Sequence, residues 1–213
     1  MRQKIFATYT GWIIAINAVA FLVFLILLNS MSQDTVISLL ALQPAAILAG
    51  KNIWTFITSM FLHAGVLHLV ANMISLMFIG SFVEKLIGKK RFLTFYFVAG
   101  LSAGILFVLI SWITGSDINV FAVGASGAIF GLGGLLAVLT PRLPVLVFFI
   151  IPMPMWAAMG VLMFGLWALS LAAGLPIGNT AHLGGLIIGL AYGFYLKKKY
   201  PRKTKMISRY FSR

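Results

Sequence analysis

Two short glycine-containing segments carry the residues best suited to covalent chemistry. Ser126 lies in the sequence GASG at 124–127, and His182 lies in the sequence AHLGG at 181–185. A serine hydroxyl becomes a strong nucleophile when a histidine beside it accepts its proton and later returns that proton to the leaving group. The sequence therefore suggests acyl transfer, with Ser126 as the candidate nucleophile and His182 as the candidate base.

A third segment carries hydrogen-bond donors. It contains His63, His68 and Asn72, and the last two are four residues apart, so they point in the same direction from one helix. The tetrahedral intermediate of acyl transfer needs donors for its negatively charged oxygen. The backbone N–H of Ser126 and the side chains of His68 and Asn72 are available for that role.

The acidic residues are too few and too distant to complete a catalytic triad. The chain has three: Glu84 falls at the far end of the segment that begins near His68, and Asp34 and Asp117 fall in expected loops. Any catalysis would therefore use a serine–histidine dyad, in which packing rather than a carboxylate orients His182.

The same residues offer no metal or cofactor site. The chain has no cysteine. His63 and His68 are five residues apart, which separates them by about 140° around a helix. A helical zinc site needs two histidines at i and i+4 with a carboxylate nearby, and that pattern is missing. We therefore expect no metal and no cofactor.

Each of these polar residues also has a simpler explanation when it is taken singly. A serine in a membrane helix commonly bonds to a backbone carbonyl of its own helix, and an asparagine can bridge two helices. What favours catalysis is that these residues lie at a similar depth in the membrane, if the apolar segments that carry them are membrane-spanning helices. Ser126 and His182 each lie on the order of 10 Å below one membrane surface, at a rise of about 1.5 Å per residue.

The elements that carry these residues are apolar segments long enough to cross a bilayer. Hydrophobic residues form 62% of the 213 positions, charged residues form 9%, and the mean hydropathy is +1.07. Soluble domains carry about 25% charged residues, so lipid must be the solvent of this chain. The sequence predicts an all-α polytopic membrane protein with six transmembrane helices, at 11–29, 64–83, 92–113, 119–139, 157–173 and 177–196.

The positive charges predict the orientation of the spans. Of the 16 Lys and Arg, all but Lys51 fall on one side of a six-span bundle, which is the cytoplasmic side by the positive-inside rule. We divide the chain into a cytoplasmic tail at 1–9, a six-helix domain at 10–196 and a basic cytoplasmic tail at 197–213. No organelle-targeting segment precedes the first span, so we expect a prokaryotic plasma membrane. Clusters that flank spans do not predict a nucleic-acid partner.

Two other stretches are expected to connect the spans. Residues 30–62 are interrupted by Pro44 and Gly50, and they predict a long outer loop with helices lying in the membrane interface. Residues 145–156 predict a connection on the cytoplasmic side that dips toward the membrane. The first apolar run is too long for a cleaved signal peptide, so we expect it to be a retained helix.

Glycines at steps of four predict close contact between two spans. Gly185 and Gly189 form a ridge of small residues on the sixth span, and Gly127 begins a similar ridge on the fourth. Such ridges let helix backbones approach closely. This contact would bring His182 near Ser126.

The three polar segments together resemble the motifs of the rhomboid family of intramembrane serine proteases. Residues 124–127 resemble the GxSG motif, residues 181–189 resemble AHxxGxxxG, and residues 63–72 resemble HxxxxHxxxN. The three occur in the family's order, on the second, fourth and sixth spans. The resemblance covers nearly the whole chain and implies the minimal six-helix form.

The resemblance also implies roles for individual residues. Ser126 and His182 would be the catalytic pair, His68 and Asn72 would be the oxyanion-hole side chains, and Phe130 would pack on the catalytic histidine. Four glycines would support the site, namely Gly124, Gly127, Gly185 and Gly189. One position departs from the family pattern, because Thr55 follows Trp54 where many members have arginine.

The function that the resemblance implies is cleavage of transmembrane segments of membrane-protein substrates, near the outer membrane face. The partners would be those substrates and the lipid bilayer. One alternative is a rhomboid-like protein that binds membrane clients without cutting them, but such proteins typically lack the serine or the histidine. A small-solute transporter is the other alternative. It would have polar groups near the midplane and paired broken helices, whereas the polar layer here is off-centre.

Overall fold

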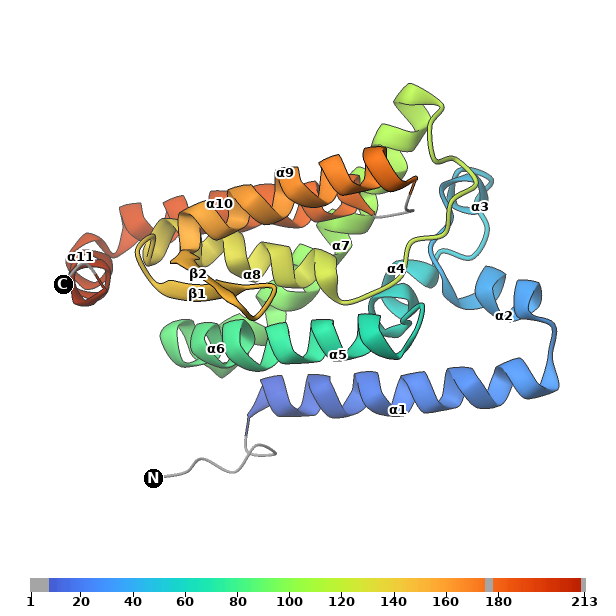
Figure 1. Ribbon diagram of the computed structural model, residues 1–213, viewed down its shortest axis with the longest axis horizontal. Helices are drawn as coiled ribbons and strands as arrows, with labels where there is room; N and C mark the ends of the chain where they lie inside the picture. The colour runs from blue at the N-terminus through green and yellow to red at the C-terminus, as the bar shows by residue number, and fades with distance from the viewer. Residues whose placement is uncertain (1–7, 175–177, 212–213) are drawn as a thin grey trace.

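Long helices form most of the part of the chain that the computed structural model describes, which is residues 8–174 and 178–211. The long helical segments are α1 (Tyr9–Ser30), the continuous run of α5 (Val66–Ser75), η3 (Leu76–Gly80) and α6 (Ser81–Ile87), and then α7 (Lys89–Thr114), α8 (Ser126–Leu139), α9 (Met155–Ala173) and α10 (Asn179–Lys199). Figure 1 shows α8 inside the bundle, in contact with α7, α9 and α10. The predicted all-α membrane bundle is confirmed.

Four of the six helical spans are long and apolar enough to cross a membrane. They are α1, the run Val66–Ile87, α7 and α9, and less than half of the apolar stretch of each is buried inside the protein. The remaining side chains are free to face lipid. Because lipid offers no hydrogen bonds to backbone N–H and C=O groups, it favours continuous helices. This exposure agrees with a chain whose solvent is a bilayer.

The other two predicted spans differ from these four. α10 has 21 residues, but it begins with the polar Asn179 and ends in three lysines. α8 has 14 residues and is buried along almost its whole length. The predicted span at 119–139 is therefore wrong at its start, because the helix begins at Ser126. The preceding segment is extended instead, and Ala122 exchanges backbone hydrogen bonds of 2.8 and 3.1 Å with Leu42.

Short helices interrupt the long connection between α1 and α5. They are α2 (Gln33–Leu40), α3 (Pro44–Leu48), α4 (Thr55–Thr58) and the 3-10 helix η2 (Ser59–Phe61). The indole N–H of Trp54 donates to the Leu39 carbonyl at 2.8 Å, and the Thr58 hydroxyl donates to the Leu40 carbonyl at 2.7 Å. The hydroxyl of the buried Thr55 donates to the Asn52 carbonyl at 2.7 Å. Side chains near α4 thus tie this connection together.

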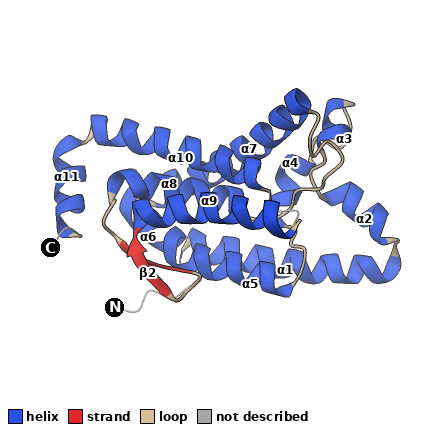
Figure 2. Ribbon diagram, turned by 45° about the horizontal axis from the view of Figure 1, so that its top comes forward, coloured by secondary structure: helices blue, strands red, loops and turns tan. Residues whose placement is uncertain are grey.

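The connection between α8 and α9 is a β-hairpin, which was not expected from the sequence. β1 (Pro144–Val147) pairs antiparallel with β2 (Ile151–Pro154), and Figure 2 shows the strands beside α9. The turn holds Phe148 and Phe149 at φ values of 51° and 62°. Phe148 and Ile150 are exposed. That this connection dips toward the membrane stays a prediction.

A buried carboxylate ties the start of α1 to α6. Glu84 accepts hydrogen bonds from the backbone N–H groups of Tyr9 and Thr10, both at 2.9 Å, and from the Thr10 hydroxyl at 2.7 Å. Glu84 is 4% exposed. A buried carboxylate with three donors is well satisfied, so this acid is committed to structure.

The structure describes little of the predicted N-terminal tail and most of the predicted C-terminal tail. Most of the tail predicted at 1–9 lies outside the described residues. In the tail predicted at 197–213, residues 197–199 end α10, and a further helix, α11 (Pro201–Tyr210), follows. The division into a central domain and two tails stays a prediction.

Candidate active site

Ser126 is the first residue of α8, at the point where the extended segment becomes a helix. The preceding Gly124 has a φ of +116°, which L side chains rarely adopt, and its N–H donates to the Ser59 carbonyl at 2.8 Å. A β-carbon at Gly124 would lie 2.9 Å from two atoms of the His68 ring and 3.7 Å from the Ser126 Oγ. Glycine is therefore favoured here both by backbone conformation and by the close approach of His68.

The two residues proposed as nucleophile and base are in direct contact. The His182 Nε2 lies 2.8 Å from the Ser126 Oγ. This distance suits proton transfer between the two groups. The Nε2 accepts the hydroxyl proton when the neutral imidazole carries its own proton on Nδ1. The structure thus brings together two residues 56 positions apart, and their catalytic roles stay predictions.

Packing holds the His182 ring. The Phe130 ring, one turn after Ser126 on α8, stacks on it with a centroid distance of 4.4 Å and an interplanar angle of 11°. The His182 side chain is buried, and its Nδ1 has no hydrogen-bond partner within residues 8–174 and 178–211. In that part of the chain the ring is therefore oriented by stacking, with no carboxylate behind it.

The two proposed oxyanion donors have different surroundings. The His68 ring lies against the turn that precedes Ser126, as its distance to Gly124 shows. The Asn72 Nδ2 instead donates to the backbone carbonyl of His68 at 2.9 Å. The structure thus places His68 beside the serine, whereas one N–H of Asn72 is used within its own helix. A side-chain amide has a second N–H, which could still serve a ligand.

His63 was not expected to belong to the candidate site, but the structure puts it next to that site. It is fully buried, and its ring packs edge-on against His68 with a centroid distance of 5.1 Å and an angle of 65°. Neither ring nitrogen has a hydrogen-bond partner in the described part of the chain. The contact limits how the His68 ring can turn. The sequence contained a signal for this contact, because His63 and His68 belong to the same HxxxxHxxxN pattern.

The backbones of α8 and α10 touch directly. A β-carbon at Gly185 would overlap the carbonyl oxygen of Gly127, and one at Gly189 would overlap the carbonyl oxygen of Gly131. A β-carbon at Gly127 would also lie 2.6 Å from the Cβ of Ala103 in α7. Glycine therefore allows α8 to pack closely against both α7 and α10, which also contact each other. This is how the histidine of α10 reaches the serine of α8.

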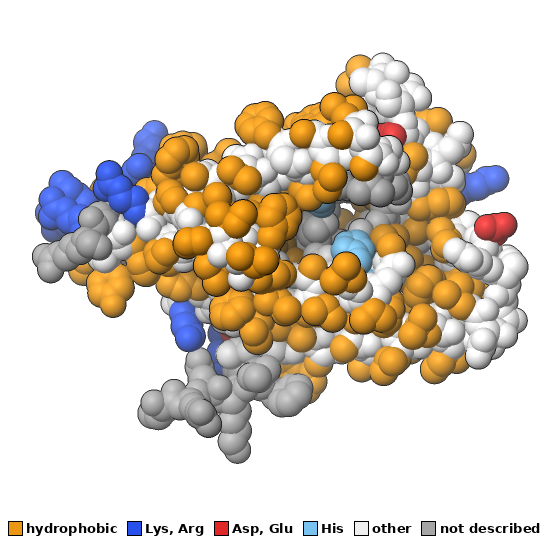
Figure 3. All heavy atoms as spheres, in the orientation of Figure 1, with side chains coloured by type: hydrophobic (Ala, Val, Ile, Leu, Met, Phe, Trp, Pro, Cys, Tyr) orange, Lys and Arg blue, Asp and Glu red, His pale blue; other side chains and the backbone are white. Residues whose placement is uncertain are grey.

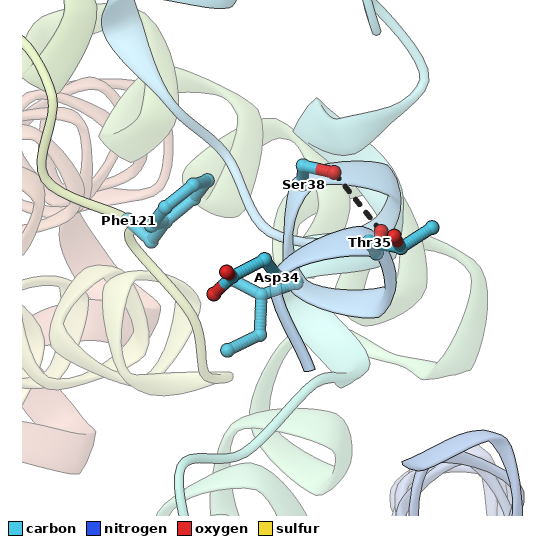
Figure 4. A pocket seen from close by; sticks show the side chains of 5 residues that line it. Asp34, Thr35, Ser38 and Phe121 are labelled. Atoms are coloured by element: carbon cyan, nitrogen blue, oxygen red, sulfur yellow. Dashed lines mark hydrogen bonds between the residues drawn. The ribbon is translucent and has the colours of Figure 1, made fainter. Parts of the chain in front are cut away.

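The hollow near the histidines (Figure 3) is separate from a cavity beside α2. Figure 3 shows a hollow in one face of the molecule with histidine at its edge. A separate cavity of about 540 Å³ is lined by Asp34, Thr35, Ile37, Ser38 and Phe121 (Figure 4). It contains none of the proposed site residues, so the chemistry is not assigned there. Among the described residues, no group of three or more His, Asp or Glu could hold a metal ion.

The chain matches proteins of one family. The family model described as Rhomboid domain matches residues 50–199. RHOMBOID-like protein 5 of Arabidopsis thaliana is 36% identical over 166 residues, which cover 78% of this chain and 50% of that protein. Rhomboid protease GluP of Bacillus subtilis (strain 168) is 30% identical over 186 residues, which cover 85% of this chain and 33% of that protein. Rhomboid-like protease 3 of Toxoplasma gondii is 27% identical over 201 residues, which cover 88% and 69% of the two chains.

The matched region of this chain contains the proposed site, but it covers only part of each relative. Ser126 and His182 both fall inside the range that the family model covers. The chain spans about half or less of the length of the plant relatives, so activity, substrates and partners of whole relatives do not transfer directly. The family model covers more than half of this chain, and the chain therefore belongs to the rhomboid family.

Proposed function

We propose that the protein is an intramembrane serine endopeptidase that cleaves transmembrane segments of membrane proteins near the outer membrane face. One observation carries the proposal: the 2.8 Å contact between the Ser126 Oγ and the His182 Nε2 inside a helical membrane bundle. A relative named as a rhomboid protease adds support. The substrates are transmembrane proteins, because the serine lies within the bundle rather than on an exposed domain.

In the proposed reaction, the Ser126 Oγ attacks the carbonyl carbon of the scissile peptide bond while its proton passes to the His182 Nε2. The backbone N–H of Ser126, the His68 side chain and the second N–H of Asn72 stabilise the oxygen that becomes negative. His182 then protonates the leaving amine, and an acyl-enzyme forms on Ser126. Water attacks this ester with His182 as base, which releases the acid and restores the serine.

We further propose that both termini are cytoplasmic and that the membrane is a prokaryotic plasma membrane. The distribution of charge supports the orientation. Figure 3 shows Lys and Arg side chains gathered toward the end of the molecule that carries α11 in Figure 1, whereas Lys51 lies in the connection between α3 and α4. Cytoplasmic ends of membrane proteins carry such an excess of positive charge. The site would then face the outer side, because Ser126 begins α8 and α8 ends near the basic face.

Two measurements on the same protein preparations test the proposal: labelling of the active-site serine and cleavage of a substrate. The purified wild-type protein should react with a serine-directed fluorophosphonate and cut a model transmembrane substrate, and Ser126→Ala and His182→Ala should lose both activities. The double variant should be no worse than either single one, since the two residues act as a unit. Ser30→Ala, at the exposed end of α1, is the matched control and should behave as wild type.

The outcome separates the two candidate functions. Cleavage by Ser126→Ala at the wild-type rate would rule out the dyad. A wild-type protein that binds the substrate without labelling or cleavage would instead be a client-binding member of the family.

A further inference from the structure

A groove of about 1150 Å³ lies between α6 and α11, and neither Ser126 nor His182 lines it. Positive charges border it on two sides, with Lys85 contributed by α6 and three cations contributed by α11. The α11 cations are Arg202, Lys205 and Arg209. All four side chains are exposed. The groove therefore presents a concentration of positive charge that the proposed reaction does not use.

Among the described residues, no acidic side chain neutralises these cations. The chain has three acidic side chains, and two of them, Asp34 and Asp117, lie in the connections at the far end of the bundle. The third, Glu84, is adjacent to Lys85 in sequence, but its carboxylate is buried and accepts three hydrogen bonds from Tyr9 and Thr10. In the described part of the chain, the groove thus lacks a counter-charge and fits an anionic ligand.

The remainder of the lining is apolar. Phe82 of α6 packs edge-on against Phe211, with a centroid distance of 5.7 Å and an angle of 71°. On α11, Met206 and Tyr210 expose 69% and 78% of their surface. A short helix with basic and large apolar side chains is typical of a helix at a membrane surface. The ligand should therefore be both anionic and apolar.

The position of α11 identifies the source of such a ligand. α10 ends at Lys199, and α11 begins at Pro201 after one intervening residue. On its other side the groove borders α6, the end of the run Val66–Ile87 that is long and apolar enough to cross a membrane, so the groove lies at the level of lipid headgroups. A free phosphate ion would match the cations but would leave the apolar lining exposed to water, whereas a phospholipid satisfies both parts.

We propose that the groove binds one anionic phospholipid of the leaflet that faces α11. Its phosphate lies among Lys85, Arg202, Lys205 and Arg209, and its acyl chain runs along the apolar lining. The proposal does not depend on proteolytic activity, and none of these residues belongs to the proposed catalytic set. An anionic lipid held there would fasten α11 to α6.

Native mass spectrometry of the detergent-purified full chain tests this proposal, with phosphatidylglycerol and phosphatidylcholine added in parallel. The groove variant combines Lys85→Gln, Arg202→Gln, Lys205→Gln and Arg209→Gln. The control variant removes the same charge outside the groove lining and combines Lys90→Gln, Lys197→Gln, Lys198→Gln and Lys203→Gln. We expect wild type and control to retain one phosphatidylglycerol in preference to phosphatidylcholine, and the groove variant to retain about tenfold less, since each juxtamembrane cation strengthens anionic-lipid binding.

Three results would overturn the proposal. Equal losses in both variants would mean diffuse attraction between basic residues and lipid. Equal retention of the two lipids by the wild type would mean that the groove does not select charge. Displacement of phosphatidylglycerol by millimolar inorganic phosphate would mean that the site recognises a free anion. The last two arms use the wild-type protein alone, so they remain decisive even if the groove variant fails to fold.

Discussion

Replacement of Gly185 by alanine tests whether the contact between α8 and α10 positions the dyad. The added β-carbon would overlap the carbonyl oxygen of Gly127, and it would lie 2.9 Å from the carbonyl carbon of Gly127 and 3.2 Å from the backbone nitrogen of Gly131. All three atoms belong to the backbone of α8, so no side-chain rotation can make room. The two helices must move apart by about an ångström, because packed interiors transmit such strain.

The expected loss follows from the geometry of the dyad. The Ser126 Oγ and the His182 Nε2 are 2.8 Å apart. Moving the two helices apart by about an ångström would take these atoms beyond the ~3.2 Å limit for proton transfer. A misplacement of about 1 Å can lower a rate about 10²-fold. We therefore expect Gly185→Ala to lower kcat/KM about 100-fold, and Gly185→Val to lower it further, although neither change touches a reacting atom.

The assay is cleavage of a model transmembrane substrate in proteoliposomes, with the Tm of each variant measured in detergent. The matched control is Gly165→Ala on α9, because a β-carbon there would meet nothing within 4 Å. Gly174 is a poor control, since its φ of +62° would strain any substitution. Wild-type kcat/KM in Gly185→Ala, with an unchanged Tm, would refute the argument that backbone contact sets the distance between serine and histidine.

Three other predictions test separate parts of the structure. Asn72→Ala and His68→Ala should each lower kcat by up to about 10²-fold, as loss of one oxyanion donor costs about 3 kcal/mol; turnover at the wild-type level would reassign that residue to packing. Glu84→Ala should lower the Tm by several degrees with little change in KM, because three hydrogen bonds to α1 are lost. EDTA and phenanthroline should leave cleavage unchanged, and inhibition that zinc reverses would contradict the serine mechanism.

Several features of the fold and candidate site could be predicted from the sequence because they depend on composition and on spacing within one helix. Apolar runs long enough for a bilayer predicted the spans, and α1 and α9 begin and end within two residues of the expected limits. The step of four between Gly185 and Gly189 predicted a ridge of small residues on one helix face, and the structure puts this face against α8.

Other features were missed either because they depend on contacts with distant segments or because the local pattern fits more than one structure. α8 begins at Ser126 rather than earlier because Ala122 pairs with Leu42, a residue from another connection. The hairpin at β1 and β2 was missed because prolines and an apolar tip are also typical of an irregular loop. The bond from Asn72 to the carbonyl of His68 was missed because helical spacing indicates the direction of a side chain and not its partner.

The helix η3 is a π turn in the middle of the second span, so it sets which changes of chain length the span can absorb. A π turn accommodates one residue more than an α turn. Deletion of one residue from Leu76–Gly80 would restore a regular helix and leave the rotation of Glu84 relative to His68 nearly unchanged. A residue inserted into the regular helix between His68 and Glu84 would instead rotate one relative to the other by about 100°. Glu84 could then keep its partners on α1, or His68 could keep its place beside Gly124, but not both. Single-residue deletions within η3 should therefore be tolerated better than single-residue insertions in this span.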